Sequence, residues 1–258
     1  MSTRRAPLTL SALAATALLL AGCTGGDDVA SGTPAGTPAG TPPATTAPPA
    51  ADPGGGTQQP GAPAAGCTGT GAAAPATAAT VETIDLDGDG VGDALWIADD
   101  GGTRTVGVTT AGGATLTHPV DLAGPAGATA FALRPDPAGP AMVLVSDNRV
   151  ADLLVVQDCA LVDATDTRGE PWQFDQGFAG QGTGVGCVDL DGDGTLDLAG
   201  LNLVDDTVTR TQIRVDGTVA SAGVADQVAA GSDAARESAR AITCGDRTLA
   251  ADGVHEPA

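Results

Sequence analysis

The sequence predicts an all-β domain at residues 67–258, and three observations support this fold class. Apolar runs in this part of the chain are short and rich in β-branched residues, and Gly, Asp, Asn and Pro separate them. Many short strands joined by turns give that pattern. Only five of the 258 residues are aromatic, so the core rests on Val, Leu and Ile. The single helix-tolerant stretch, Ser232–Ala241, lacks a clear apolar stripe. The predicted strands lie within Thr80–Ile84, Ala94–Ala98, Thr105–Thr109, Ala141–Ser146, Leu153–Val156, Leu198–Leu203 and Thr207–Val215.

A positive segment and an apolar run precede this domain at the start of the chain. Arg4 and Arg5 are followed by Leu8–Leu20, which is too short for a membrane span of about 20 apolar residues and suits a signal peptide. The letters LAGC, ending at Cys23, resemble the lipobox of bacterial lipoproteins. The resemblance implies that residues 1–22 are a signal peptide and that Cys23 carries a lipid. That lipid would anchor the protein to the outer face of the cytoplasmic membrane, exposed to the cell wall or exterior. An ordinary signal peptide with a chance cysteine is the alternative.

The segment after the cysteine has the composition of a linker. Residues 24–66 are almost wholly Gly, Pro, Ala and Thr, and the tetrapeptide GTPA occurs twice in succession. Such a segment has little apolar surface to bury, and its prolines favour extended backbone. We therefore expect residues 23–66 to be a lipidated cysteine and a disordered linker that holds the domain away from the membrane.

The charge balance restricts the partners. The chain has 11 arginines, no lysine and 32 acidic residues, a formal net charge of −21 at pH 7. Without residues 1–22 it keeps nine of the arginines and all of the acids, a formal charge of −23. Such a surface repels nucleic acid and anionic headgroups and attracts divalent cations. We expect no nucleic-acid partner.

Four cysteines remain in the predicted domain: Cys67, Cys159, Cys187 and Cys244. An even number in an exported domain predicts two disulfides, for which three pairings exist. We expect Cys159–Cys187 and Cys67–Cys244, because the second pair would tie the start of the domain to its end. No two cysteines are spaced for zinc.

Two nine-residue segments, Asp85–Asp93 and Asp189–Asp197, are close copies with the letters DLDGDGVGD and DLDGDGTLD. Carboxylates occupy positions 1, 3, 5 and 9, and the glycine at position 6 permits a sharp bend. Calcium takes about six to eight oxygen ligands, which carboxylates and a backbone carbonyl at position 7 would supply. The predicted calcium ligands are Asp85, Asp87, Asp89, Asp93 and the carbonyl of Val91, and Asp189, Asp191, Asp193, Asp197 and the carbonyl of Thr195.

Other calcium loops fit less well. An EF-hand needs a glutamate at position 12, where this chain has Trp96 and Gly200. A dockerin also needs an acid there and keeps its two loops close together, whereas these loops lie 104 residues apart. A solvated Asp/Gly turn without metal is the plainest alternative.

The aspartates at positions 1, 3, 5 and 9 between two strands resemble the FG-GAP/VCBS repeats of integrin-like β-propellers. The resemblance implies that each loop joins neighbouring strands and that calcium is structural. The chain is too short for seven blades, so we expect a small or incomplete propeller-like repeat domain, or another sheet assembly with the same loop. Leu133–Leu144, midway between the loops, resembles a decayed copy that keeps Asp136 and Gly139. Ile242–Asp246 lies where a fourth unit would begin.

No motif in the sequence indicates catalysis. Of the two histidines, His118 precedes a proline and His255 lies near the C-terminus. Neither position suits a Ser-His-Asp arrangement. Gly180–Gly186 lacks the spacing of a phosphate-binding loop, and we expect a flexible loop there.

The function expected from these features is a non-enzymatic surface interaction domain that binds a protein or a cell-wall glycan. One alternative is a carbohydrate-binding module, in which Trp96 or Trp172 would stack on sugars, although so few aromatic residues count against it. The other is a cell-wall hydrolase or hydrolase-associated domain, which would need an acid–base pair outside both loops.

Overall fold

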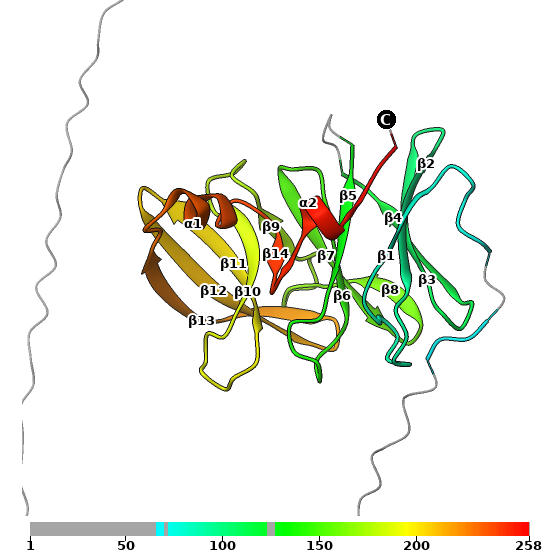
Figure 1. Ribbon diagram of the computed structural model, residues 1–258, viewed down its shortest axis with the longest axis horizontal. Helices are drawn as coiled ribbons and strands as arrows, with labels where there is room; N and C mark the ends of the chain where they lie inside the picture. Colours follow the sequence, from blue (N-terminus) through cyan, green and yellow to red (C-terminus); the bar gives the residue numbers. More distant parts are fainter. Residues whose placement is uncertain (1–65, 70–71, 123–126, 258) are drawn as a thin grey trace, which may run out of the picture. The chain divides into compact units, whose positions relative to one another are not determined.

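The computed structural model describes residues 66–69, 72–122 and 127–257, and these residues form 16 strands and two short helices (Figure 1). All seven predicted runs overlap a strand, and the helix-tolerant stretch contains a helix. The strands are β1 (Ala79–Glu82), β2 (Ala94–Asp100), β3 (Thr103–Thr109), β4 (Thr115–Val120), β5 (Thr129–Leu133), β6 (Met142–Ser146), β7 (Val150–Gln157), β8 (Ala160–Asp163), β9 (Gln173–Asp175), β10 (Gly184–Val188), β11 (Asp197–Val204), β12 (Thr207–Asp216), β13 (Val219–Ala229), β14 (Thr243–Cys244), β15 (Arg247–Thr248) and β16 (Val254–His255). The helices are α1 (Asp233–Ser238) and α2 (Leu249–Asp252).

Twelve of the strands form three antiparallel meanders of four consecutive strands each. The first sheet is β1-β2-β3-β4 and the third is β10-β11-β12-β13. The middle sheet is β5-β6-β7-β8, with β16 added on β5 and β9 added on β7. Short turns join the paired strands, as between β7 and β8, where Asp158 and Cys159 both have positive φ angles. This antiparallel arrangement confirms the all-β prediction.

The middle sheet packs between the other two, so both of its faces are buried. Every residue of β5 and β6 is buried, and alternate residues point to opposite faces. One face meets the first sheet in a cluster that includes Ala130, Val143, Val145, Leu154, Leu95, Ile97, Val106 and Val108. The other face meets the third sheet in a cluster that includes Phe131, Leu144, Leu153, Val155, Val185, Leu198 and Ile213. Figure 1 shows the resulting order of the three sheets.

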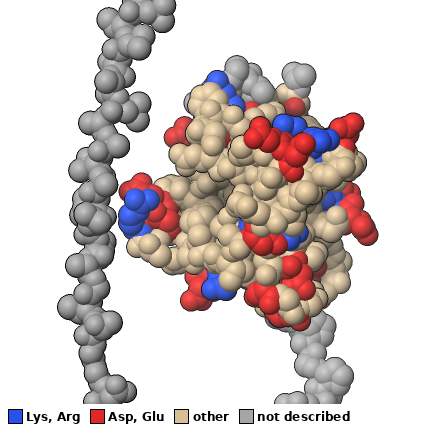
Figure 2. Space-filling view, turned by 90° about the vertical axis from the view of Figure 1, so that its left-hand side faces the viewer, with Lys and Arg blue, Asp and Glu red and all other residues tan. Residues whose placement is uncertain are grey.

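The opposite face of the third sheet packs against the segment around α1. Leu201, Leu203 and Val208 form a small buried cluster with Ala230 and Ala239. The helix begins after Ser232, whose hydroxyl accepts a hydrogen bond from the backbone N–H of Ala235. Figure 2 views this side of the molecule and shows acidic and basic side chains in several separate groups, with uncharged residues between them.

The C-terminal segment connects the third sheet back to the middle sheet. Ile242, just before β14, forms a parallel bridge with Val185 of β10, and β16 then pairs with β5. Beyond β16, the carboxylate of Glu256 accepts hydrogen bonds from the backbone N–H of Ala128 and from Arg104 Nε, at 2.7 and 3.0 Å. The segment thereby contacts all three sheets.

All four domain cysteines form disulfides, but the expected pairing was wrong. The bonds are Cys67–Cys159 and Cys187–Cys244, not Cys159–Cys187 and Cys67–Cys244. Cys67 belongs to the cluster between the first and middle sheets, where the β7–β8 turn places Cys159. Cys187 of β10 meets Cys244 because β14 lies beside β10. Two disulfides indicate an oxidising compartment outside the cytoplasm.

The predicted signal peptide (residues 1–22), Cys23 and the linker up to residue 65 lie outside the described residues. Among the residues that are described, no helix has the length and apolar character needed to cross a membrane.

Candidate metal centres

The two Asp-rich loops occupy the same place in two sheets. Asp85–Asp93 connects β1 to β2 at the start of the first sheet, and Asp189–Asp197 connects β10 to β11 at the start of the third. The glycines at position 6, Gly90 and Gly194, have φ angles of 87° and 91°. Only a residue without Cβ adopts this conformation at no steric cost, so these glycines make the bend as predicted.

Within the first loop, the carboxylates are held by backbone N–H groups. Asp85 accepts hydrogen bonds from Gly88 and Gly90, at 2.6 and 2.9 Å. Asp87 accepts one from the N–H of position 5 at 3.3 Å, and Asp89 accepts one from the N–H of position 7 at 2.7 Å. The carboxylate of Asp93, at position 9, accepts one from the N–H of position 2 at 2.7 Å.

The second loop repeats these five hydrogen bonds position by position. Asp189 accepts from Gly192 and Gly194, at 2.7 and 3.1 Å. The N–H groups of positions 5, 7 and 2 donate to the carboxylates of positions 3, 5 and 9 at 3.3, 2.7 and 2.8 Å. The matching sequences therefore fold into matching loops.

In each loop three carboxylates converge. Oxygen atoms of Asp85, Asp87 and Asp89 lie within 4.8 Å of one another, as do oxygens of Asp189, Asp191 and Asp197. Oxygens bound to one calcium ion at about 2.3–2.6 Å are at most about 5 Å apart, so either set fits a single ion. Each cluster is a group that could hold a metal ion, but the two sets differ at one position.

The difference lies in the partners of positions 5 and 9. Asp93 is 1% exposed and lies outside the cluster, and its second oxygen accepts a hydrogen bond from the N–H of Ala111. In the second loop the equivalent oxygen of Asp197 accepts from Gln212 Nε2 at 2.7 Å. There it is Asp193 that lies outside, and the hydroxyl and N–H of Thr195 both donate to it.

Groups from elsewhere in the chain fix the loops. The backbone N–H of Cys67 donates to Asp87 at 2.7 Å, next to the first disulfide. Gln212 on β12 also donates to Asp191, at 3.2 Å. The position-7 residues differ in exposure, since Val91 is 55% exposed and Thr195 is half-buried. A role for their carbonyls stays a prediction.

The pKa values of the carboxylates follow their surroundings. Burial raises the pKa of Asp85, but the N–H donors of Gly90 and Gly88 outweigh it and bring the pKa below its ordinary value. Burial raises the pKa of Asp93 above its ordinary value, and the nearby charges of Asp87 and Asp85 add to that shift. The hydrogen bonds from Thr195 lower the pKa of Asp193.

The middle sheet carries a third loop in the same place, without the acids. Residues 134–141 join β5 to β6, within the stretch predicted to be a decayed copy. Asp136 forms a local turn there, accepting the N–H of Ala138 through its carboxylate and that of Gly139 through its carbonyl. Arg134 of this loop reaches the first loop, where it donates to the carbonyl of Leu86 at 3.3 Å.

Acidic groups outside the loops line a cleft of about 370 Å³ between β4, β7 and β8. His118 contacts the carbonyl of Leu161 through Nδ1, at 3.3 Å, and Asp163 through Nε2, at 3.2 Å. Asp152 accepts a hydrogen bond from Gln173 at 2.7 Å, and burial raises its pKa. Sequence reasoning missed this cleft because its residues come from separate strands with no common motif. His255 lies apart from it, in β16.

The comparisons with known proteins found no matching family model, no matching curated protein and no matching solved structure.

Proposed function

We propose that this protein is a calcium-stabilised interaction module without catalytic activity, exported and held on the outer face of the membrane through Cys23. The observation that supports the calcium site is the repetition of the same five hydrogen bonds in two loops 104 residues apart. A turn without a ligand has no need to reproduce five hydrogen bonds and a convergence of three carboxylates in two sheets.

Electrostatics supports a cation in each loop. Three carboxylates within 4.8 Å repel one another when ionised, and a divalent cation between them removes that repulsion. Hard oxygen ligands select calcium, magnesium or manganese rather than zinc or copper. Calcium is the best match because it tolerates irregular sets of oxygen ligands, whereas magnesium demands a tight octahedron.

We also propose that the three four-stranded meanders are the blades of a small, incomplete propeller-like array. Each meander runs through four consecutive strands, and each carries its loop between its first and second strands. The hairpin β14–β15 falls within the segment where a fourth unit is expected. In this arrangement calcium would be structural, and the partner, a protein or a cell-wall glycan, would bind elsewhere on the sheets.

The calcium proposal is tested by thermal unfolding in calcium, in magnesium and in a chelator. A ligand that binds only the folded chain stabilises it by RT ln(1 + [L]/Kd). Extracellular calcium sites commonly have Kd values of about 10⁻⁴–10⁻³ M, so each site contributes about 0.4–1.4 kcal/mol at 1 mM calcium. Asp87→Asn and Asp191→Asn should each remove part of the rise in Tm. Asp100→Asn, at an exposed residue outside both loops, is the matched control. Identical melting curves in calcium and in chelator would contradict the proposal.

A hydrolase is the second candidate, favoured by the cleft that contains His118, Asp152 and Asp163. Perturbed pKa values in a cleft are typical of catalytic sites. Against it, each of these groups already has a partner within the chain, which suits a tie between the first and middle sheets. Release of sugars from cell-wall polysaccharide by the native protein, lost in Asp152→Asn, would favour the hydrolase instead.

A further inference from the structure

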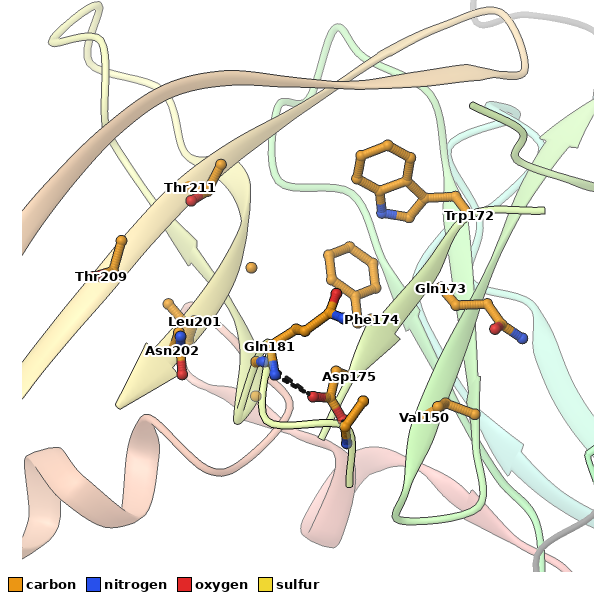
Figure 3. Close-up of a pocket in the computed structure, with 14 residues that line it drawn as sticks. Val150, Trp172, Gln173, Phe174, Asp175, Gln181, Leu201, Asn202, Thr209 and Thr211 are labelled. Carbon is orange, nitrogen blue, oxygen red and sulfur yellow. Dashed lines mark hydrogen bonds between the residues drawn. The ribbon is translucent and has the colours of Figure 1, made fainter. Parts of the chain in front are cut away.

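A groove of about 350 Å³ lies between the middle and third sheets, away from both metal loops. One wall consists of β9 and the loop after it, and the other consists of β11 and β12 (Figure 3). The second loop ends at Asp197, where β11 begins, and the groove residues Gly200 and Asn202 follow further along that strand. The volume is at the lower end of the range of ligand pockets, about 300–1,000 Å³.

The groove exists because the inner face of the third sheet changes from apolar to polar along its strands. Leu198 and Ile213 pack against the middle sheet. Beyond them the strand register pairs Gly200 with Thr211 and Asn202 with Thr209, so these residues form one neutral polar patch on that face. A Cβ atom at Gly200 would lie 3.6 Å from the ring of Phe174, so any larger side chain there would fill the groove.

Two aromatic residues, Trp172 and Phe174, line the opposite wall, and a third, Phe178, follows close by in the sequence. Trp172, Phe174 and Phe178 lie within seven residues, and they are three of only five aromatics. Trp172 and Phe174 pack edge to face, with ring centroids 6.3 Å apart. Figure 3 shows both rings beside the groove, across from the threonines of β12. Phe178 stands at the surface, 64% exposed, under the guanidinium of Arg149.

The one acidic residue of the groove is already engaged. Asp175 Oδ1 accepts hydrogen bonds from the N–H groups of Phe178 and Ala179, and Oδ2 accepts from those of Gln181 and Gly182. Four donors hold the loop 176–182 in place and satisfy the carboxylate. A flexible loop was expected at Gly180–Gly186, but the carboxylate holds the first part of that stretch and Gly184–Gly186 belong to β10.

The remaining polar groups are neutral and point to the class of ligand. No arginine lines the groove, so a phosphate, sulfate or carboxylate would find no counter-charge, and the net charge of −21 repels it further. The amides of Gln181 and Asn202 and the hydroxyls of Thr209 and Thr211 each offer donors and acceptors beside an aromatic surface. A ligand with many hydroxyls and apolar ring faces matches this lining.

We infer that the groove formed by Trp172, Phe174, Gln181, Gly200, Asn202 and Thr211 binds a neutral saccharide. This inference rests on the proposed function and extends it, because it identifies the partner of the module as an uncharged glycan. It depends on residues that the metal loops do not use, so the two proposals are tested separately.

Calorimetric titration of the full chain, in calcium, with a panel of saccharides tests this inference. The panel contains neutral trisaccharides of glucose, mannose and galactose, anionic oligogalacturonate and cationic chitosan trimer, each up to about 10 mM, above the millimolar Kd at which binding free energy is about −4 kcal/mol. We expect at least one neutral trisaccharide to bind and neither charged sugar to do so. Binding should change the tryptophan fluorescence, and Trp172→Phe should abolish that change.

Variants locate the binding. Gly200→Val should block it, and Thr211→Val, which removes one hydroxyl at constant shape, should weaken it by about tenfold. Thr117→Val, at an exposed threonine of β4, is the matched control and should leave affinity unchanged. The inference would be overturned if no neutral sugar bound, or if a charged sugar bound more tightly. Full affinity in a folded Gly200→Val variant would also overturn it. Saccharide binding that persists while the protein ignores calcium would support the groove and contradict only the metal proposal.

Discussion

The ninth residue of the motif meets a different hydrogen-bond donor in each loop. Asp93 and Asp197 occupy the same motif position, yet only Asp197 joins its cluster. The donor to Asp93 is the N–H of Ala111, from the turn after β3, and the donor to Asp197 is Gln212 of β12. The motif predicted eight carboxylate ligands, and six of these carboxylates converge in the two clusters. It did not predict this difference, because the donor residues lie far away in sequence.

Asp152 gives a prediction for the pH dependence of stability. Burial raises its pKa, and the charges of Asp163 and Asp147 raise it further, against the hydrogen bond from Gln173. The folded state therefore binds its proton more tightly than the unfolded state, where the pKa is about 3.9. The contribution of this group to the free energy of unfolding is fully present below the unfolded pKa. It is lost as the pH rises through the folded pKa. Asp152→Asn should thus raise the free energy of unfolding at pH 7 and flatten this part of the pH profile.

Urea unfolding between pH 3 and pH 7 measures this effect. Asp121→Asn is the control, since Asp121 lines the same cleft but is exposed. A variant at position 152 that is less stable than the native protein at pH 7 would show that the charge of Asp152 is needed in the fold.

Among the elements, the long hairpin β12–β13 contains an irregularity that serves the second loop. The strand register shifts between Thr211 and Ile213, so Gln212 lies opposite a bulge formed by Gly223 and Val224 of β13. Bulges commonly redirect a side chain, and the side chain of Gln212 is 3% exposed and directed to Asp191 and Asp197.

Replacement of Gln212 by leucine should change the calcium response of one loop and not that of the other. Gln212→Leu loses two hydrogen bonds to carboxylates and should lower the free energy of unfolding by about 2 kcal/mol. It should weaken the calcium response of the second loop and leave that of the first unchanged, as measured by titration in an Asp87→Asn background and in an Asp191→Asn background. Gln157→Leu, at an exposed glutamine, should change neither quantity.

Some strands that the sequence failed to predict depend on their partners. β13 has three valines among eleven residues, its other residues have little strand preference of their own, and it is extended because it pairs with β12 along its length. The two-residue strands β14, β15 and β16 depend wholly on their partners. Strands with Val, Ile and Leu, such as β2 and β7, were predicted because their own residues favour the pleated, half-buried state.

At the level of the whole molecule, the disulfides connect parts that are distant in sequence. One bond joins the start of the domain to the middle sheet, and the other joins the third sheet to the C-terminal hairpin. The expected pairing failed because it assumed that Cys67 and Cys244 meet each other, whereas Cys67 is bonded to the middle sheet and Cys244 to the third sheet.

Peptide mapping of the unreduced protein should find Cys67–Cys159 and Cys187–Cys244. These bonds span sequence separations of 92 and 57 residues. Because each restricts a long loop of the unfolded chain, replacing both cysteines of either pair by serine should cost about 4 kcal/mol of stability. Urea unfolding of the two double variants measures this cost. Recovery of a peptide linking Cys67 to Cys244 would contradict the arrangement of sheets described above.

The position of Cys67 determines how the domain responds to mechanical force. A force applied to the chain before Gly66 acts first on Cys67. There it is shared between the backbone that follows Cys67 and the disulfide bond to Cys159. That bond carries load directly to the β7–β8 turn of the middle sheet, which is buried on both faces. We expect the disulfide to keep the hydrogen bond from Cys67 N–H to Asp87 in place under tension. The first loop should therefore stay folded in the oxidised domain under forces that would unfold it in the reduced domain.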